Sequence, residues 1–303
     1  MGLLIVPVAL AVVAFLFNLA TSSTEQANTQ KRYENDQQIS EQRYKNDQEI
    51  AADKQKEDLL QTYFDRMSDL LLNHNLRSSD PKDEVRNIAR SRTLTVLSRL
   101  DANRKGSVLQ FLRESDLIKK KGTIINLEDS DLSGADLRDA NLVFTYMSGA
   151  NLSGANLSGA LLQGADMSSA NLWNADLSRA DLYESDLIHT NLIYTNLSGA
   201  NLYKTNLTNT KLSGKDLSGA NLRETVLNSA DLKGADLSST ILYLADLAFT
   251  DLSEADLSGA NLGVADLHGA HLNSTKLDGA NLRGSNITQE QISSAKSSKD
   301  AIL

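Results

Sequence analysis

Polar and apolar positions repeat with a period of five residues from Leu127 to Ile287. A large apolar side chain, nearly always leucine, returns at every fifth position without a slip, which makes 33 consecutive pentapeptides. Two positions before nearly all of them stands a small residue, most often alanine, as at Ala135 and Ala150, and otherwise serine or threonine, as at Thr190. The position between the two is usually Asp or Asn.

A period of five residues fits neither common secondary-structure element. On an α-helix, five residues advance about 140° beyond a full turn, so the leucines would scatter around every face. On a flat strand, an odd period sends successive leucines to opposite faces. A chain that keeps all of them inside must turn a corner about every five residues. The pattern therefore predicts a narrow β-solenoid with leucine and alanine inside and the other three positions facing water.

The pentapeptide Ala150–Gly154, with the sequence ANLSG, resembles the A(D/N)LxG repeats of the pentapeptide-repeat family, and the likeness covers residues 123–287. The resemblance implies an all-β fold, a right-handed quadrilateral β-helix with four pentapeptides per coil. Carried over to this chain, it implies about eight coils and a rod of roughly 40 Å at the usual ~4.8 Å spacing between strands.

The first residues carry an uncharged apolar run, Gly2–Ala20. Nineteen helical residues span about 28 Å, so we predict a transmembrane anchor over residues 1–22. A cleaved signal peptide is the alternative, although no Lys or Arg precedes the run and Asn18–Ala20 is a poor cleavage site. Lys31 and Arg32 follow the run, which by the positive-inside rule predicts a single-pass membrane protein with the bulk of the chain in the cytoplasm.

Residues 23–56 are predicted to form a polar helical stalk. Residues Arg32–Ile39 nearly repeat as Arg43–Ile50, an eleven-residue period that corresponds to 3.67 residues per turn of a long helix. Tyr and Ile do not share one stripe, so a solvated stalk is the first interpretation and an oligomerisation helix the second.

Residues 57–122 are predicted to form a basic amphipathic module of three helices, because apolar residues recur there at helical spacing. Asp80 and Pro81 mark the start of the second helix, and the third is expected after Gly106. The sequence of this module resembles the linker module of membrane-anchored pentapeptide-repeat proteins, for which we know no activity.

Charge is distributed unevenly along the chain. The net charge of −9 divides into −4 for residues 1–76, +6 for residues 77–122 and −11 for residues 123–303. The basic block is interpreted as a solvated surface, a contact to anionic lipid headgroups or a nucleic-acid contact. Its candidate contacts are Arg86, Arg90, Arg92, Arg99, Arg104, Lys105, Lys119, Lys120 and Lys121.

Two departures from the repeat are notable. Lys215 stands where a small inward residue belongs, and we expect a local distortion of the coil there. Large apolar and aromatic residues also occupy outward positions of neighbouring coils and form a possible interaction patch. They are Trp173, Tyr183, Ile188, Ile193, Tyr194 and Tyr203. Residues 288–303 are predicted to be a C-terminal helical cap, because Thr288 and Gln291 form a capping-box pattern.

No catalytic constellation is visible in the sequence. The chain has no cysteine, and its glycines follow the repeat instead of forming a phosphate-binding loop. His268 and His271 are expected on different faces of the solenoid, which argues against a shared metal. We therefore predict no enzyme, no cofactor, no metal and no small-molecule substrate.

These patterns predict a non-enzymatic, membrane-anchored scaffold or protein–protein interaction module with an unknown protein partner. The resemblance implies one alternative, a DNA-mimic rod that binds DNA gyrase, and the net charge of −11 on residues 123–303 agrees with it. The other alternative is nucleic-acid binding through the basic helical module.

Overall fold

A computed structural model describes residues 5–119 and 122–303, and the side chains of residues 10–303 other than 27, 120 and 121. The chain divides into two compact units, Met1–Asp58 and Leu59–Leu303. The described part of the first unit belongs entirely to helix α1, Ile5–Asn73, which continues into the second unit. The described residues of the predicted anchor and the predicted stalk therefore lie on one uninterrupted helix.

The predicted membrane anchor at residues 1–22 is not supported. Within the described residues, no helix has a stretch that is long and apolar enough to cross a bilayer. The side chains of residues 1–9 lie outside this description, and the remaining apolar run, Leu10–Ala20, rises only about 16 Å as a helix. The large apolar side chains of that run are exposed, among them Phe15 and Phe17.

The second unit begins with a helical part, here called the cap, which comprises residues 59–119. It contains the last turns of α1, the short 3₁₀-helix η1 (Leu76–Ser78), α2 (Glu84–Leu97) and α3 (Ala102–Glu114). Asp83 is the N-cap residue of α2, close to the predicted start. The prediction that the third helix follows Gly106 was wrong, because α3 begins at Ala102 with Asp101 as its N-cap.

Gly106 lies inside α3 because the helix approaches the solenoid closely at this point. A Cβ atom on Gly106 would lie 2.3 Å from the backbone oxygen of Asp136. Next to it, the amide of Asp136 donates to the carbonyl of Ala102 over 3.0 Å. Glycine is therefore required here by packing, although a glycine in a helix interior weakens the helix by about 1 kcal/mol relative to alanine.

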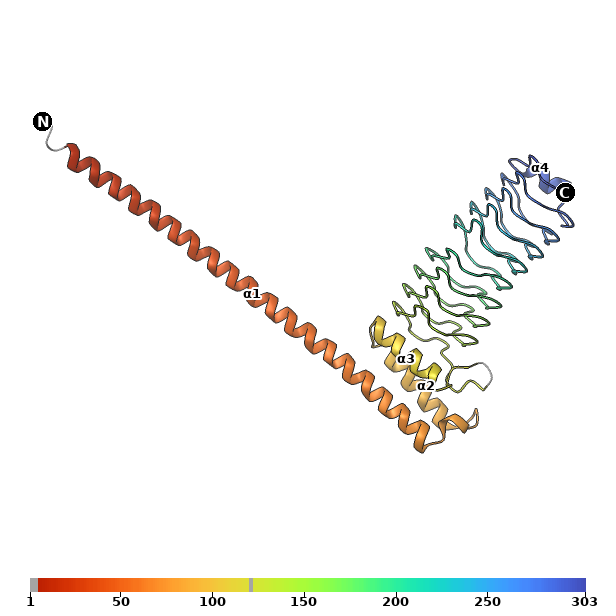
Figure 1. Ribbon diagram of the computed structural model, residues 1–303, viewed down its shortest axis with the longest axis horizontal. Helices are drawn as coiled ribbons and strands as arrows, with labels where there is room; N and C mark the ends of the chain where they lie inside the picture. The colour runs from red at the N-terminus through yellow and green to blue at the C-terminus, as the bar shows by residue number, and fades with distance from the viewer. Residues whose placement is uncertain (1–4, 120–121) are drawn as a thin grey trace. The chain divides into compact units, whose positions relative to one another are not determined.

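Residues 123–287 form the rod, a stack of square coils in which residue i pairs with residue i+20 through a parallel bridge, as in Asp131↔Asn151. Each side of a coil pairs with the next coil through one bridge at most, so no long strands form. Figure 1 shows the coils in sequence order, with α2 and α3 at the first coil and α4 at the last. We call the four sides of the rod faces A, B, C and D. In the first coil they contain Leu127, Leu132, Leu137 and Leu142, respectively, and the same face recurs every 20 residues.

The corners are β-turns in which the second central residue has a positive φ. In the turn that begins at Leu152, the amide of Ala155 donates to the carbonyl of Leu152 over 3.0 Å, and Gly154 has φ +65°. Glycine, Asn and Asp tolerate this conformation best, which explains why glycine is frequent two positions after the stacked leucine. At Gly164, packing adds to the requirement, because a Cβ would lie 2.3 Å from the ring of Phe144.

The rod interior is filled by leucine and alanine, as the repeat predicted, and the solenoid fold is confirmed. Leu152, Leu172 and Leu192 are fully buried and stand 20 residues apart in one stack. The interior joins the apolar core of the cap without a break, from Leu60 to Leu282. Most small-residue positions that hold threonine satisfy the buried hydroxyl, as when Thr205 donates to the carbonyl of Leu182 over 2.8 Å, and Thr145 is an exception.

The far end of the rod is closed by α4, Gln289–Ser294, with the predicted capping box between Thr288 and Gln291. The Gln291 side chain also donates to the carbonyls of Leu267 and Ala270 over 2.7 and 2.9 Å. The C-terminal segment is more than a helical cap. After α4 the chain resumes the ladder, and Ile302 pairs with Asn281.

Candidate interaction surfaces

The exterior of the rod carries whatever binding specificity the rod has, because its interior is filled with side chains. Within the described residues, no group of three or more His, Cys, Asp or Glu side chains is arranged to hold a metal ion. A cleft of about 850 Å³ lies between α3 and the first coil. It mixes Arg113 and Arg138 with Glu114 and Asp139, so its charges do not converge on a ligand of one sign.

The predicted patch of six apolar and aromatic residues is divided among three faces of the rod. Because a coil takes 20 residues, positions ten apart lie on opposite faces. Trp173, Ile193 and Tyr194 lie on face B, Tyr183 and Tyr203 on the opposite face D, and Ile188 on face A between them. The sequence alone could have shown this division, because residues share a face only when their positions in the 20-residue coil are the same or adjacent.

The first group, which we call the face B cluster, consists of Trp173, Ile193 and Tyr194 and is exposed. Their exposed fractions are 46%, 39% and 73%. The rings of Trp173 and Tyr194 meet edge to face, with centroids 6.2 Å apart. This contact orders two large rings that remain open to solvent, which is typical of a protein contact site.

The aromatic residues of face D contact cations of the same chain. The rings of Tyr183 and Tyr203 lie 5.3 Å apart, and the Lys204 ammonium is 5.3 Å from the Tyr203 ring. The Arg223 guanidinium lies between the rings of Tyr203 and Tyr243, at 5.8 and 5.4 Å. The Tyr183 hydroxyl donates to Glu184 over 2.7 Å, which raises the pKa of Tyr183. These rings contribute to a column of stacked side chains and are less available to a partner than the face B cluster.

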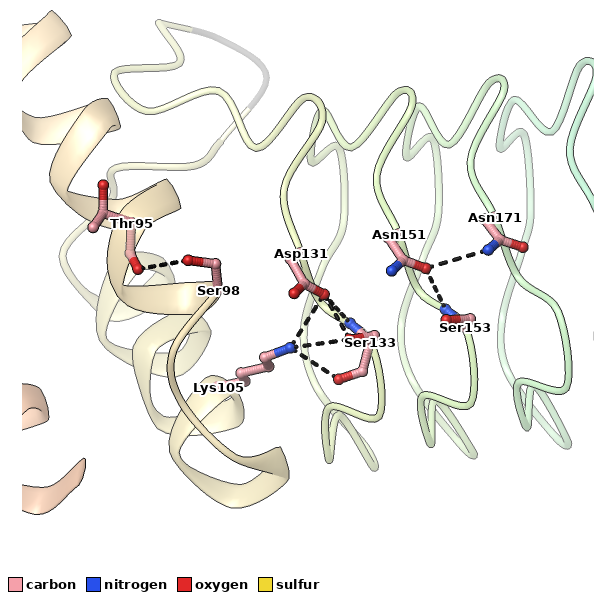
Figure 2. Close-up of polar contacts among 8 residues, drawn as sticks. All are labelled: Thr95, Ser98, Lys105, Asp131, Ser133, Asn151, Ser153 and Asn171. Atoms are coloured by element: carbon pink, nitrogen blue, oxygen red, sulfur yellow. Dashed lines mark hydrogen bonds and ion pairs between the residues drawn. The ribbon is translucent and has the colours of Figure 1, made fainter. Parts of the chain in front are cut away.

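The residue before each stacked leucine is usually polar, and on each face these residues form a column along the rod. On face B the Asn171 amide donates to Asn151, and the Asn191 amide donates to Asn171 over 3.0 Å (Figure 2 shows the first pair). On face C, Asp216, Asp236 and Asp256 follow one another, and like charges in such positions repel. Lys276 relieves the end of this column by an ion pair of 2.7 Å, and its hydrogen bond lowers the pKa of Asp256 to about 2.

The ladder between two coils is interrupted beside Lys215. Elsewhere on face C the amide before each leucine donates to the preceding coil, as Asp236 does to the carbonyl of Lys215 over 2.8 Å. The corresponding amide of Asp216 makes no such bond, and the carbonyl of Thr195 accepts from the Lys215 ammonium instead, over 2.6 Å. On face B, the amide of Lys211 likewise lacks its bond to the preceding coil.

The predicted distortion at Lys215 is thus confirmed. The Lys215 side chain is half-buried, no carboxylate within the described residues pairs with it, and burial lowers its pKa. The interruption lies between the coil that carries Ile193 and Tyr194 and the next coil.

Three of the nine predicted basic contacts hold the cap on the rod. Lys105 is 4% exposed, and its ammonium donates to the Ser133 carbonyl over 2.9 Å and contacts Asp131 at 3.3 Å (Figure 2). Arg90 donates to the carbonyls of Asn126 and Glu128 over 3.0 and 2.9 Å. Arg86 donates to the carbonyl of Thr123 over 3.1 Å.

The remaining predicted basic contacts differ in their surroundings. Arg104 pairs with Asp101 over 2.6 Å, and Lys119 pairs with Asp116. Arg92 and Arg99 both line a cleft between α1 and α2. Lys120 and Lys121 lie outside the described residues. These residues therefore do not form a single continuous basic surface. Rod carbonyls bind three of them, and Asp101 and Asp116 each pair with one more.

Comparison with known proteins agrees with this architecture. The sequence matches the family model described as pentapeptide repeats in eight copies over residues 125–243 and 250–289, which is more than half of the chain. No curated protein sequence gave a significant match.

Solved structures with related coils include three of known source or role. The chain is similar to HetL, a pentapeptide repeat protein involved in heterocyst differentiation regulation from the cyanobacterium Nostoc sp. strain PCC 7120. The identity is 33%, over 64% of this chain and 93% of that chain, with a TM-score of 0.28. A pentapeptide repeat protein from the Arabidopsis thaliana thylakoid lumen shows 39% identity over 27% of this chain and 64% of that chain, with a TM-score of 0.21. QnrB1, a plasmid-mediated fluoroquinolone resistance protein, shows 20% identity over 58% of this chain and 84% of that chain, with a TM-score of 0.27. The repeat model and the observed coils together place the chain in the pentapeptide-repeat family.

Proposed function

We propose that this protein is a non-enzymatic scaffold that binds a protein partner through the face B cluster of its rod. The observation that carries the proposal is the exposure of Trp173, Ile193 and Tyr194 next to one another on a rigid stack of coils. Aromatic side chains held in place before binding lose little entropy when a partner covers them, so they contribute strongly to affinity. The filled interior of the rod supports a role in binding instead of catalysis, because catalysis requires a partly dry concave site.

Removing the two rings should weaken partner capture without unfolding the protein. We expect the double variant W173A/Y194A to bind its partner at least about tenfold more weakly than the wild type. Each ring that a partner buries contributes about 2 kcal/mol or more to the binding free energy. The control is F144A/F249A, which removes two exposed rings from other faces. The measurement is quantitative pull-down with the full chain, alongside thermal unfolding. Equal capture by W173A/Y194A and the control would refute the proposed site.

We further propose that the protein acts at a membrane. The support is the row of exposed apolar side chains on α1 from Leu10 to Leu19, which water solvates poorly. The full chain should sediment with membranes, and L10S/F15S/F17S should move it to the supernatant. A wild-type chain that stays in the supernatant would contradict this localisation.

Gyrase binding by DNA mimicry stays a prediction of the family resemblance. Its support is the net charge of the repeat region, while the columns of the rod mix aspartate with Asn and with cations such as Lys211 and Lys276. The face B cluster is the more specific feature, and we therefore favour protein binding through it.

A further inference from the structure

A second candidate site lies in the cap, in a cleft of about 300 Å³ between the last turns of α1 and α2. Its lining residues on α1 occupy positions 59, 62, 63 and 66, which share one helical face. The buried side chains of Tyr63 and Val96 form its floor. The Tyr63 hydroxyl is bound to the Thr93 hydroxyl at 2.9 Å, so the floor is fixed in place.

Three arginines surround this apolar floor: Arg66 on α1, Arg92 on α2 and Arg99 just after the end of α2. Among the described residues, none of the three arginine side chains has a hydrogen bond or an ion pair, and no Asp or Glu lines the cleft. Arg86 and Arg90, on the same helix α2, are both engaged by rod carbonyls. Arg92 and Arg99 of the basic block, together with Arg66, therefore remain available to an external anion.

The lining of the cleft indicates the kind of ligand. Arg92 lies inside α2, and Arg99 lies two residues beyond the last residue of this helix. A single small anion would pair with the arginines but leave the apolar floor uncovered. An acidic peptide covers the floor and brings carboxylates to both sides of it. The volume of the cleft suits one large apolar side chain between them.

We propose that this cleft, here called the arginine cleft, binds an acidic segment of a protein partner. One large apolar side chain of the segment packs on Tyr63 and Val96. Carboxylates on either side of it pair with Arg66, Arg92 and Arg99, because the guanidinium group matches a carboxylate with two parallel hydrogen bonds. A buried apolar anchor with charges at its rim is the usual anatomy of a peptide contact. This contact is separate from the face B cluster, and neither proposal requires the other.

The test uses the full chain and a fluorescein-labelled peptide of glutamates with a central Leu-Phe pair, followed by fluorescence anisotropy. Two further peptides serve as comparisons, one with Ser-Ser in place of Leu-Phe and one with lysines in place of glutamates. Phosphatidylglycerol vesicles provide the membrane comparison. The variants are R66E/R92E/R99E, which reverses the charge, and T95W, which fills the cleft without changing the charge. The matched control R32E/R43E/R179E makes the same change in net charge at exposed arginines elsewhere.

We expect the Leu-Phe glutamate peptide to bind the wild type and the control alike. Binding should weaken at least tenfold in R66E/R92E/R99E and in T95W, and the two comparison peptides should bind at least tenfold more weakly to the wild type. An equal loss of peptide binding in the control variant would mean that only the net charge of the protein matters, and it would overturn the proposal. Retention by T95W, equal binding of the Ser-Ser peptide, or binding of vesicles without binding of the peptide would overturn it as well.

Discussion

Replacing Leu172 by alanine should destabilise the rod by about 2–5 kcal/mol, whereas the same replacement at Leu161 should change its stability by about 0.5 kcal/mol or less. The two leucines are eleven residues apart, with one pentapeptide between those to which they belong, and the chemical change is identical. Leu172 is fully buried in the stack on face B. Leu161 stands at the outward position before the stacked leucine of face D and is 40% exposed.

The contrast follows from the cavity that each change leaves. Removal of the Leu172 side chain leaves a void between Leu152 and Leu192, and the square coil cannot collapse on it because its four sides are fixed by the ladder to both neighbours. Removal of the Leu161 side chain leaves space that water fills. Its column neighbours are Asn141 and Asp181, so little apolar contact is lost.

Urea unfolding of both variants, followed by circular dichroism, measures this difference. A solenoid unfolds in units of neighbouring coils, so the slope of the transition must be compared along with its midpoint. Equal midpoints for the two variants would contradict the assignment of inward and outward positions on which the whole description of the rod depends.

The sequence predicted the rod well because its signal is local and repeated. A five-residue period of leucine allows only a chain that turns at regular corners, and each coil repeats the same evidence. The same periodicity places Lys215 at an inward position, which is why the distortion beside it was foreseeable.

The sequence was a poorer guide to the cap because cap contacts join residues far apart in the chain. Gly106 resembled a helix break, yet it permits α3 to approach the carbonyl of Asp136. Arg90 resembled a surface cation, yet it donates to two carbonyls of the rod. Arg66 was not singled out at all, because the charge pattern of α1 alone does not show that it faces Arg92 and Arg99 across a cleft.

Replacing Lys215 by alanine should stabilise the rod by about 1–2 kcal/mol, an unusual direction for a change in a repeat interior. Five of the other residues in the same column on face C are alanines: Ala135, Ala155, Ala175, Ala235 and Ala255. Alanine at 215 removes a half-buried cation that has no carboxylate partner. It also frees the carbonyl of Thr195 to accept from the amide of Asp216, as in the neighbouring coils.

The pH dependence of this gain has a definite sign. Burial lowers the pKa of Lys215 from its ordinary value of 10.5. Between the lowered value and 10.5 the unfolded chain binds more protons at this site than the folded chain, so wild-type stability rises with pH in that window. K215A lacks this contribution, and its advantage over the wild type should shrink as the pH approaches 10.5.

Hydrogen exchange distinguishes this mechanism from a general effect of removing a lysine. The amide of Asp216 should become protected in K215A, because it regains its acceptor on Thr195, while exchange at Asp236 should stay slow in both proteins. K211A is the matched control, since Lys211 is an exposed lysine of the same coil, and it should change neither stability nor exchange at Asp216. If K215A were less stable than the wild type, or left the amide of Asp216 unprotected, the lysine would have to be a structural part of the coil and not the cause of its opening.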